Sequence, residues 1–354
     1  MLMVNSPMRG SDTTNYRREI LIKRARNAAI SIIAAVIIVW FLLSKIDPRD
    51  IPHAIGNVSL QGLLLAFLLY AASVFFKAVR FKVILRTGIT LRQLFPIVSL
   101  YMFFANILPM RTGELSYVYL LKRQARTPGT KSFASLVVGG ISDAAVILLA
   151  MSIVGWYLRS ALTEGISRFF SAAGQVVKGN LLPLAAVTAL LLVVIIGLLM
   201  LRRHWMQGDR ISRIRHLASS VKVKVLEVGS ELANVSFDMR LLGIIACSVL
   251  IISLRFSTLW YLVRSMGIAI NIWKLSFALL FGVLFSLVPV HGPAGFGTVE
   301  APWVMSLVLL NVPEKDAITS GFGLHIVIIM YCIVLGLCGA IALKVSSRGA
   351  MRDG

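Results

Sequence analysis

Long, unbroken apolar runs dominate this sequence. They cover residues 28–43, 62–85, 93–108, 132–158, 181–201, 241–263, 275–288, 300–310 and 318–343. A helix needs roughly 20 residues to cross the hydrocarbon layer of a membrane, and several of the runs reach that length. The strands of a closed β-barrel would instead alternate apolar and polar residues, which these runs do not. The sequence therefore predicts an all-α, multi-pass membrane protein.

Composition leads to the same fold class and excludes several functions. Of the 354 residues, 58% are apolar and 14% are charged, so a water-soluble core could not hide the apolar surface. Cys247, Cys332 and Cys338 lie in apolar runs without the spacing of metal ligands. The sequence also lacks a Walker A loop, an HExxH motif and a nucleophile elbow. We expect no metal, no cofactor and no ATP-driven transport by this chain alone.

The basic residues predict how the chain is oriented, and we do not take the net charge of +21 as a sign of nucleic-acid binding. Lys and Arg favour the cytoplasmic side of membrane segments. The basic ends, residues 1–27 and 344–354, are therefore predicted to be cytoplasmic, with the protein in the inner (cytoplasmic) membrane. A full crossing at 93–108 would place the next basic cluster outside. The conflict disappears if 93–121 is a re-entrant hairpin from the cytoplasmic side and 275–310 is a second one from the outer side.

This arrangement contains about six full transmembrane helices and two oppositely oriented re-entrant hairpins with broken helices. Opposed hairpins are typical of an inverted repeat, in which broken helices meet near the midplane at a substrate site. We place repeat 1 at about 62–158 and repeat 2 at about 241–343. The segment "VRFKVILRTGI" (79–89) resembles "LRFSTLWYLVRSMGI" (254–268), which supports the repeat.

A basic loop at residues 202–240 separates the two repeats. Within it, residues 211–235 carry apolar side chains at helical spacing, with lysine and glutamate filling much of the other face. The pattern predicts an amphipathic helix on the inner membrane surface or against the bundle, with a solvated connector as the alternative. Both repeats and the loop belong to a single transmembrane domain, residues 28–343.

Two segments place helix-breaking residues and charges at membrane depth. They are "NILPMRTGELSYVYLLKR" (106–123) and "PVHGPAGFGTVE" (289–300). Broken helices offer free backbone N–H groups and half-helix N-termini, which attract anions, and arginine suits phosphate. We therefore predict a site for a phosphate-bearing lipid head group. Its predicted residues are Arg80, Asn106, Arg111, Gly113, Arg255, Gly295 and Gly297.

Further ionisable residues lie at membrane depth, where a charge costs roughly 2.5–3.5 kcal/mol at a helix centre. Such groups must face inward and pair, bind a ligand or line water. We predict gating or proton-coupling roles for Glu114, Asp143, His291, Glu300 and His325. Asp143 and His325 occupy matching positions of the repeat and are predicted to act as a relay or counter-charge.

Structural alternatives stay open for the same residues. Glu114 could pair with Arg111 or complement the positive end of a half-helix, and Glu300 has the same dipole alternative. Arg255 and Asp143 could form a structural ion pair. Each histidine could be hydrogen-bonded scaffold.

At the two hairpins the sequence resembles the lysylphosphatidylglycerol synthase transmembrane region, also called the flippase-like domain family. The resemblance rests on Arg80 in "VRF", the segment 106–123, Asp143 in "GGISD" and "PVHGPAGFGTVEA". It covers residues of about 25–345. The resemblance implies a link to the translocation of aminoacylated phospholipids, or to other envelope lipids in stand-alone members.

The sequence also departs from the family. No aminoacyltransferase domain follows residue 343, so we expect a stand-alone member without lysyl transfer to phosphatidylglycerol. Tyr117 and Val299 stand where the family often has arginine, and "VVGGISD" has glycines where an acidic–basic pair is usual. The head-group preference of better-known members cannot be carried over.

We expect an integral membrane lipid translocase that moves a phosphate-bearing lipid or lipid-linked head group. One alternative is a membrane-embedded transferase that uses Glu114, Asp143 or His325 as a general base. Another is a non-catalytic partner of a lipid synthase or glycosyltransferase. The expected partners are membrane lipids and, for the third hypothesis, a lipid-modifying enzyme. The sequence leaves open which lipid is moved, the direction of transport, its energy source and the oligomeric state.

Overall fold

The structure is a computed structural model, and it describes residues 33, 35–108, 113–179, 239–285 and 292–350. Within these ranges the chain forms helices and no strand. The helices are α2 (Asp50–Gly56), α3 (Leu60–Leu85), α4 (Leu91–Ile107), α5 (Glu114–Ala125), α6 (Gly129–Tyr157), α7 (Arg159–Gly179), α10 (Met239–Ser265), α11 (Ile272–Phe285), the short 3₁₀ helix η2 (Pro293–Gly295), α12 (Glu300–Leu309) and α13 (Glu314–Ala350). Residues 35–43 are helical as well.

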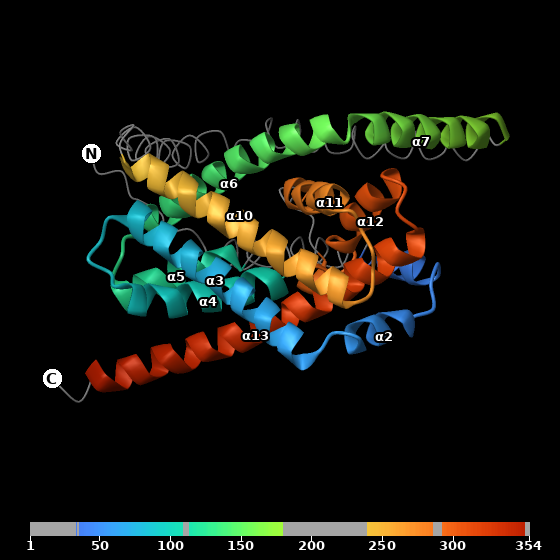
Figure 1. The fold of residues 1–354 in the computed structure, drawn as a ribbon. Coiled ribbons are helices and arrows are strands. Elements are labelled where there is room, and N and C mark those ends of the chain that lie inside the picture. Colours follow the sequence, from blue (N-terminus) through green and yellow to red (C-terminus); the bar gives the residue numbers. More distant parts are fainter. Residues whose placement is uncertain (1–32, 34, 109–112, 180–238, 286–291, 351–354) are drawn as a thin grey trace, which may run out of the picture.

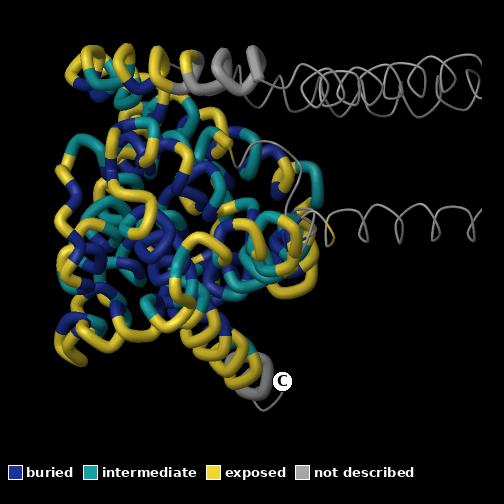
Figure 2. Tube along the Cα trace, turned by 90° about the vertical axis from the view of Figure 1, so that its right-hand side faces the viewer, coloured by how far each residue is buried: buried dark blue, intermediate teal, exposed yellow. Residues whose placement is uncertain are grey.

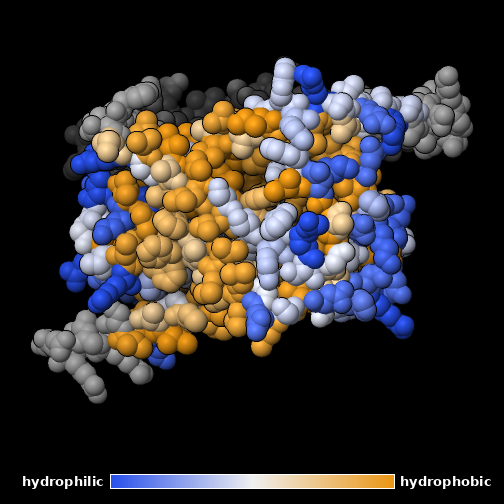
Figure 3. All heavy atoms as spheres, in the orientation of Figure 1, coloured by the Kyte–Doolittle hydropathy of each residue, from blue (hydrophilic) through white to orange (hydrophobic). Residues whose placement is uncertain are grey.

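Four of these helices are long and apolar enough to cross a membrane: α3, α6, α10 and the part of α13 from Glu314 to Val345. Their outward side chains are largely apolar and exposed, whereas buried residues gather inside the bundle (Figure 2). On the face shown in Figure 3, a broad apolar area lies between two polar ends. The prediction of an all-helical, multi-pass membrane protein is confirmed. The other predicted spans lie in residues described only in part (28–43) or outside the described residues (181–201).

Four apolar or mixed helices are too short to cross alone. α4, α5, α11 and α12 have 17, 12, 14 and 10 residues, against roughly 20 for a full span. In Figure 1, α4 and α5 lie toward the end of the bundle where α13 ends, and α11 and α12 lie toward the end where α13 begins. The short helices thus form two pairs on opposite ends of the long ones.

Local signals explain where the first pair begins. Arg86 adopts a left-handed conformation (φ 49°) and ends α3. Thr90 and Gln93 then form a capping box at the start of α4, in which the Thr90 N–H donates to the Gln93 side-chain oxygen at 3.3 Å. The chain therefore reverses between residues 86 and 90, which brings α4 against α3.

The two halves of the chain pack against each other through long and short helices. α10 packs along α3, α13 along α4, and α11 against α6. Two glycines of α13 allow its close approach to α4. A Cβ added at Gly336 would come within 2.6 Å of the Phe103 Cβ, and one at Gly339 within 2.7 Å of the Pro96 carbonyl oxygen. Small residues at such contacts are typical of membrane helix packing.

Two helices differ from the sequence prediction. The apolar runs predict no helix for residues 159–180 or near residue 50, yet α7 and α2 lie there. Both mix polar and apolar residues, so a search for membrane-length apolar runs passes over them. α7 contacts α6 and α12, and Gly165 lies directly against the carbonyl of Leu309. The amphipathic helix predicted at 211–235 lies outside the described residues.

Candidate functional site

A cavity of about 330 Å³ lies between the two pairs of short helices. The first pair contributes residues at its junction, including Asn106 and Glu114, and the second pair contributes Gly295 and Thr298. α4 of the first pair also contacts η2, the short helix between α11 and α12. The cavity therefore brings together the two breaks that the sequence analysis singled out.

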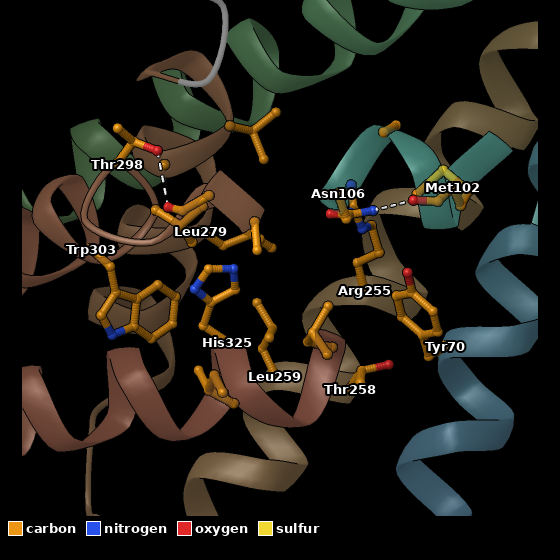
Figure 4. A pocket seen from close by; sticks show the side chains of 18 of the residues that line it. Tyr70, Met102, Asn106, Arg255, Thr258, Leu259, Leu279, Thr298, Trp303 and His325 are labelled. Carbon is orange, nitrogen blue, oxygen red and sulfur yellow. Dashed lines mark hydrogen bonds between the residues drawn. The ribbon is translucent and has the colours of Figure 1, made fainter. Parts of the chain in front are cut away.

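One wall of the cavity carries two cations and an amide. Lys77 comes from α3, Arg255 from α10 and Asn106 from the end of α4. Figure 4 shows Arg255, Asn106 and Tyr70 on the same side of the cavity. The Asn106 side-chain amide donates to the Met102 carbonyl at 2.7 Å, so its side-chain oxygen is available to the cavity. Among the described residues, neither Lys77 nor Arg255 takes part in an ion pair.

Lys77 was missed by sequence reasoning. It lies in the apolar run 62–85, one helical turn before Arg80, and that spacing was the available signal. Its ammonium lies 3.3 Å from the Met102 sulfur and 5.3 Å from the centre of the Tyr101 ring. Both are weak partners for a full charge.

The opposite wall carries a histidine–carboxylate pair. With Glu300 ionised, the His325 Nδ1–H donates to Glu300 Oε1 at 2.6 Å, and Oε2 of the same carboxylate accepts from the Gly297 N–H at 2.8 Å. Glu300 is fully buried and His325 is 8% exposed. His325 lines the cavity beside Trp303 (Figure 4), and its ring packs on Phe296 with the ring centres 4.8 Å apart. Glu300 thus orients an imidazole that faces the cavity.

Gly295 and Gly297, which lie between α11 and α12, mainly allow the backbone to turn. Gly295 and Gly297 both have φ +79°, a left-handed conformation that glycine adopts without steric cost. Their N–H groups donate to the Gly292 carbonyl (2.9 Å) and to Glu300 respectively. Sequence reasoning assigned free amides to these positions; in the structure both amides have protein partners.

The buried Arg80 forms an ion pair with the half-buried Asp143, away from the cavity lining. Arg80 is 1% exposed and donates to both oxygens of Asp143, with 3.0 Å between Nη2 and Oδ2, and also to Ser248 Oγ at 2.7 Å. The bonds join α3, α6 and α10. Gly139 leaves the space for the guanidinium, since an added Cβ would lie 3.2 Å from Nη2.

This pairing decides one open alternative and corrects one expectation. The carboxylate of Asp143 pairs with Arg80 and not with Arg255, because the guanidinium of Arg80 points across to α6 from the neighbouring α3. The partner of His325 is Glu300, so Asp143 and His325 belong to two separate pairs and do not form one relay. Sequence spacing could match these residues between repeats but could not show which of them meet.

The remaining predicted residues are placed only in part. Arg111 and His291 lie outside the described residues, and with Arg111 the alternative of an Arg111–Glu114 pair. Glu114 lines the cavity at the start of α5. Gly113, just before it, is buried directly against the Phe104 carbonyl, where no larger residue would fit. Among the residues that the structure describes, no cluster of His, Cys, Asp and Glu could hold a metal ion.

A comparison with protein families decides the classification. Residues 28–336 match the lysylphosphatidylglycerol synthase TM region. The chain belongs to this family. The matched range includes both pairs of short helices and every residue that lines the cavity. No curated protein matches the chain.

Tyr117 and Val299 differ from the arginine that members of the lysylphosphatidylglycerol synthase TM family often have, and the structure shows what surrounds each of them. Tyr117 is buried against Phe81 and Tyr101, and its hydroxyl lies 3.1 Å from that of Ser135. Val299 lines the cavity and is 43% exposed. An uncharged residue therefore stands at both places, and the cationic side chains of the cavity come from α3 and α10.

Proposed function

We propose that this chain is a lipid translocase that moves a phosphate-bearing lipid or lipid-linked head group across the cytoplasmic membrane. The head group would pass through the cavity between the two pairs of short helices while its acyl chains stay in the bilayer. Family membership supports a lipid-related membrane function. The observation that carries the proposal is Arg255, which lines this cavity without an ion-pair partner among the described residues.

The cost of charge inside a membrane gives that observation its weight. An arginine at a helix centre costs roughly 2.5–3.5 kcal/mol on insertion scales, so it is retained where it pairs, binds or lines water. Arg80 and Glu300 have close charged or hydrogen-bonding partners. Arg255 instead faces the cavity beside Asn106 (Figure 4), and a guanidinium matches the oxygens of a phosphate group.

The proposal includes two re-entrant hairpins, α4–α5 and α11–α12, related by an inverted repeat. The packing supports it. Suppose that α3, α4, α5 and α6 are matched in order with α10, α11, α12 and α13. The contact between α4 and α13 then corresponds to the contact between α11 and α6, and the contact between α3 and α10 corresponds to itself. Such repeats place a substrate site where the broken helices meet. In this proposal both termini are cytoplasmic and the protein lies in the inner membrane, as the basic residues predict.

Each ionisable group has a role in the proposal. Arg255 holds the phosphate, and Glu114 and the Glu300–His325 pair gate the cavity or exchange protons with it. Arg80, engaged by Asp143 and Ser248, has no direct role at the head group and fixes the position of α3 against α6 and α10.

The Glu300–His325 pair also favours a second candidate function. A carboxylate that orients a cavity-facing imidazole is a common arrangement for a general base, so the cavity could serve a membrane-embedded transferase acting on a lipid head group. Product formation by the purified protein, without movement of the acceptor lipid, would select this candidate.

Reconstitution tests the translocase proposal. We expect the purified protein in liposomes to move the head group of at least one labelled phospholipid class faster than empty liposomes do, with and without a pH gradient. Arg255→Gln should slow this movement about tenfold or more, because a charge-assisted hydrogen bond to phosphate is lost.

Arg264→Gln is the matched control, since Arg264 lies on the same helix, is exposed and does not line the cavity. Movement no faster than in empty liposomes for every lipid class would refute the proposal. Equal effects of the two substitutions would refute the role of Arg255.

A further inference from the structure

We propose that Lys77 is a second phosphate-binding residue, and that Lys77 and Arg255 together bind one oxyanion, the phosphate of a lipid head group. The inference rests on the proposed function for the lipid nature of the ligand. It adds a residue that neither the sequence motifs nor the family resemblance indicated, and with it a preference for phosphate-bearing over uncharged head groups.

The first argument is the surroundings of the ammonium group. Lys77 lies in the second half of a membrane-length helix, α3, and lines the cavity. Its near neighbours are the Met102 sulfur at 3.3 Å and the Tyr101 ring at 5.3 Å. A thioether is a weak acceptor, and an aromatic ring compensates only part of a charge. Among the described residues no carboxylate lies within 4.0 Å of it, so the ammonium lacks an ion-pair partner.

The second argument compares the positions of the Lys77 and Arg80 charges. Lys77 and Arg80 are three residues apart on α3 and so lie on neighbouring parts of its surface. Arg80 is neutralised by Asp143 of α6, and it does not line the cavity. Lys77 therefore provides the cavity with the cation from α3, as Arg255 provides one from α10.

The third argument is chemical complementarity between the two cations. A guanidinium offers a planar pair of donors, and an ammonium offers three donors around a compact charge. Together they can satisfy several oxygens of a tetrahedral phosphate, while the Asn106 side-chain oxygen, also in the lining, can accept from a hydroxyl of the head group. Diacylglycerol, which has no phosphate, would leave both cations unpaired.

Binding measurements test the inference apart from transport. The probes are phosphatidylglycerol, diacylglycerol with the same acyl chains, and inorganic phosphate, each titrated against the purified full chain in a neutral detergent. We expect Lys77→Gln to weaken phosphatidylglycerol binding about tenfold or more, Lys77→Arg to restore most of it, and diacylglycerol binding to stay unchanged. Lys82→Gln, on the exposed side of the same helix, is the control and should bind as the wild type does.

The outcomes separate the two proposals. If Lys77→Gln binds phosphatidylglycerol as the wild type does, the inference is wrong and the proposed function stands. If the wild type does not prefer phosphatidylglycerol over diacylglycerol, the inference fails, and the proposed function is decided by the liposome assay alone. Competition by inorganic phosphate would assign binding to phosphate alone; without competition, the acyl chains are also required, and the role of Lys77 stands in either case.

A second measurement tests the inference on the wild-type protein, so that it does not depend on whether a Lys77 variant folds. Acetic anhydride modifies accessible amines, and mass spectrometry locates the modified lysines. We expect phosphatidylglycerol, but not diacylglycerol, to slow acetylation of Lys77 in the wild type at least several-fold and to leave Lys82 unaffected. Equal acetylation of Lys77 with both lipids would contradict the inference.

Discussion

At the scale of single residues, the membrane-depth charges fall into two groups. Arg80 with Asp143, and Glu300 with His325, are paired in the protein. Lys77 and Arg255 face the cavity without an ion-pair partner among the described residues. Within the first group, Arg80 and Asp143 hold helices together and Glu300 orients the cavity-facing His325; the second group is suited to binding a ligand.

The ion pair between the buried Arg80 and the half-buried Asp143 should matter for stability. Asp143→Asn leaves a guanidinium that is only 1% exposed without its carboxylate, although Asp143 itself is 28% exposed. We expect a cost between the roughly 1 kcal/mol of an exposed pair and the roughly 3–5 kcal/mol of a fully buried one. We expect a clearly lower melting temperature in detergent. Glu164→Gln is the control, because it breaks an ion pair whose side chains are 55% and 60% exposed, where the cost is under about 1 kcal/mol. Equal shifts in the two variants would contradict a structural role for Asp143.

The residue scale is also where sequence reasoning fell short. It selected Arg255, Glu114, Gly295 and His325, all of which line the cavity. It joined Asp143 and His325 in one relay, left Arg255 open as a partner of Asp143, and overlooked Lys77. Which charges meet depends on how the helices are rotated against each other, and one sequence without three-dimensional contacts does not contain that information.

At the scale of helices, apolar runs predict the long membrane segments well because hydrocarbon thickness fixes their length. α3, α6, α10 and α13 begin and end within a few residues of the predicted runs, apart from the longer C-terminal end of α13. α7 was not predicted because it is amphipathic and lacks such a run.

The close approach of α4 and α13 can be tested by substituting a glycine at their contact. Gly339→Ala would place a Cβ 2.7 Å from the Pro96 carbonyl oxygen and 3.3 Å from the Ser99 Cβ. We expect a loss of about 1–3 kcal/mol in stability from overpacking, measured as thermal unfolding in detergent.

Gly243→Ala on α10 is the matched control, since nothing lies within 4 Å of its added Cβ. Alanine favours a helix over glycine by up to about 1 kcal/mol, so this variant should be unchanged or more stable. A Gly339→Ala protein as stable as Gly243→Ala would mean that α4 and α13 do not approach so closely.

At the scale of the whole molecule, the two halves of the chain meet at the cavity. Each half supplies one long helix with a cavity-facing cation, one pair of short helices and one membrane-depth pair that includes a carboxylate. The pairs differ chemically, Arg–Asp in the first half and Glu–His in the second. A site built this way has one wall rich in cations and another with a group that can exchange a proton.

The central claim, that this cavity holds a phosphate-bearing lipid head group, is tested most directly by the lipid that purifies with the protein. The measurement is an experimental structure of the protein extracted with its native lipids, together with mass spectrometry of the bound lipid. We predict a lipid phosphate within hydrogen-bonding distance of Arg255, between α4–α5 and η2, and loss of that lipid in Arg255→Gln. A cavity without lipid phosphate, with lipids found only around the outer surface of the bundle, would contradict the claim.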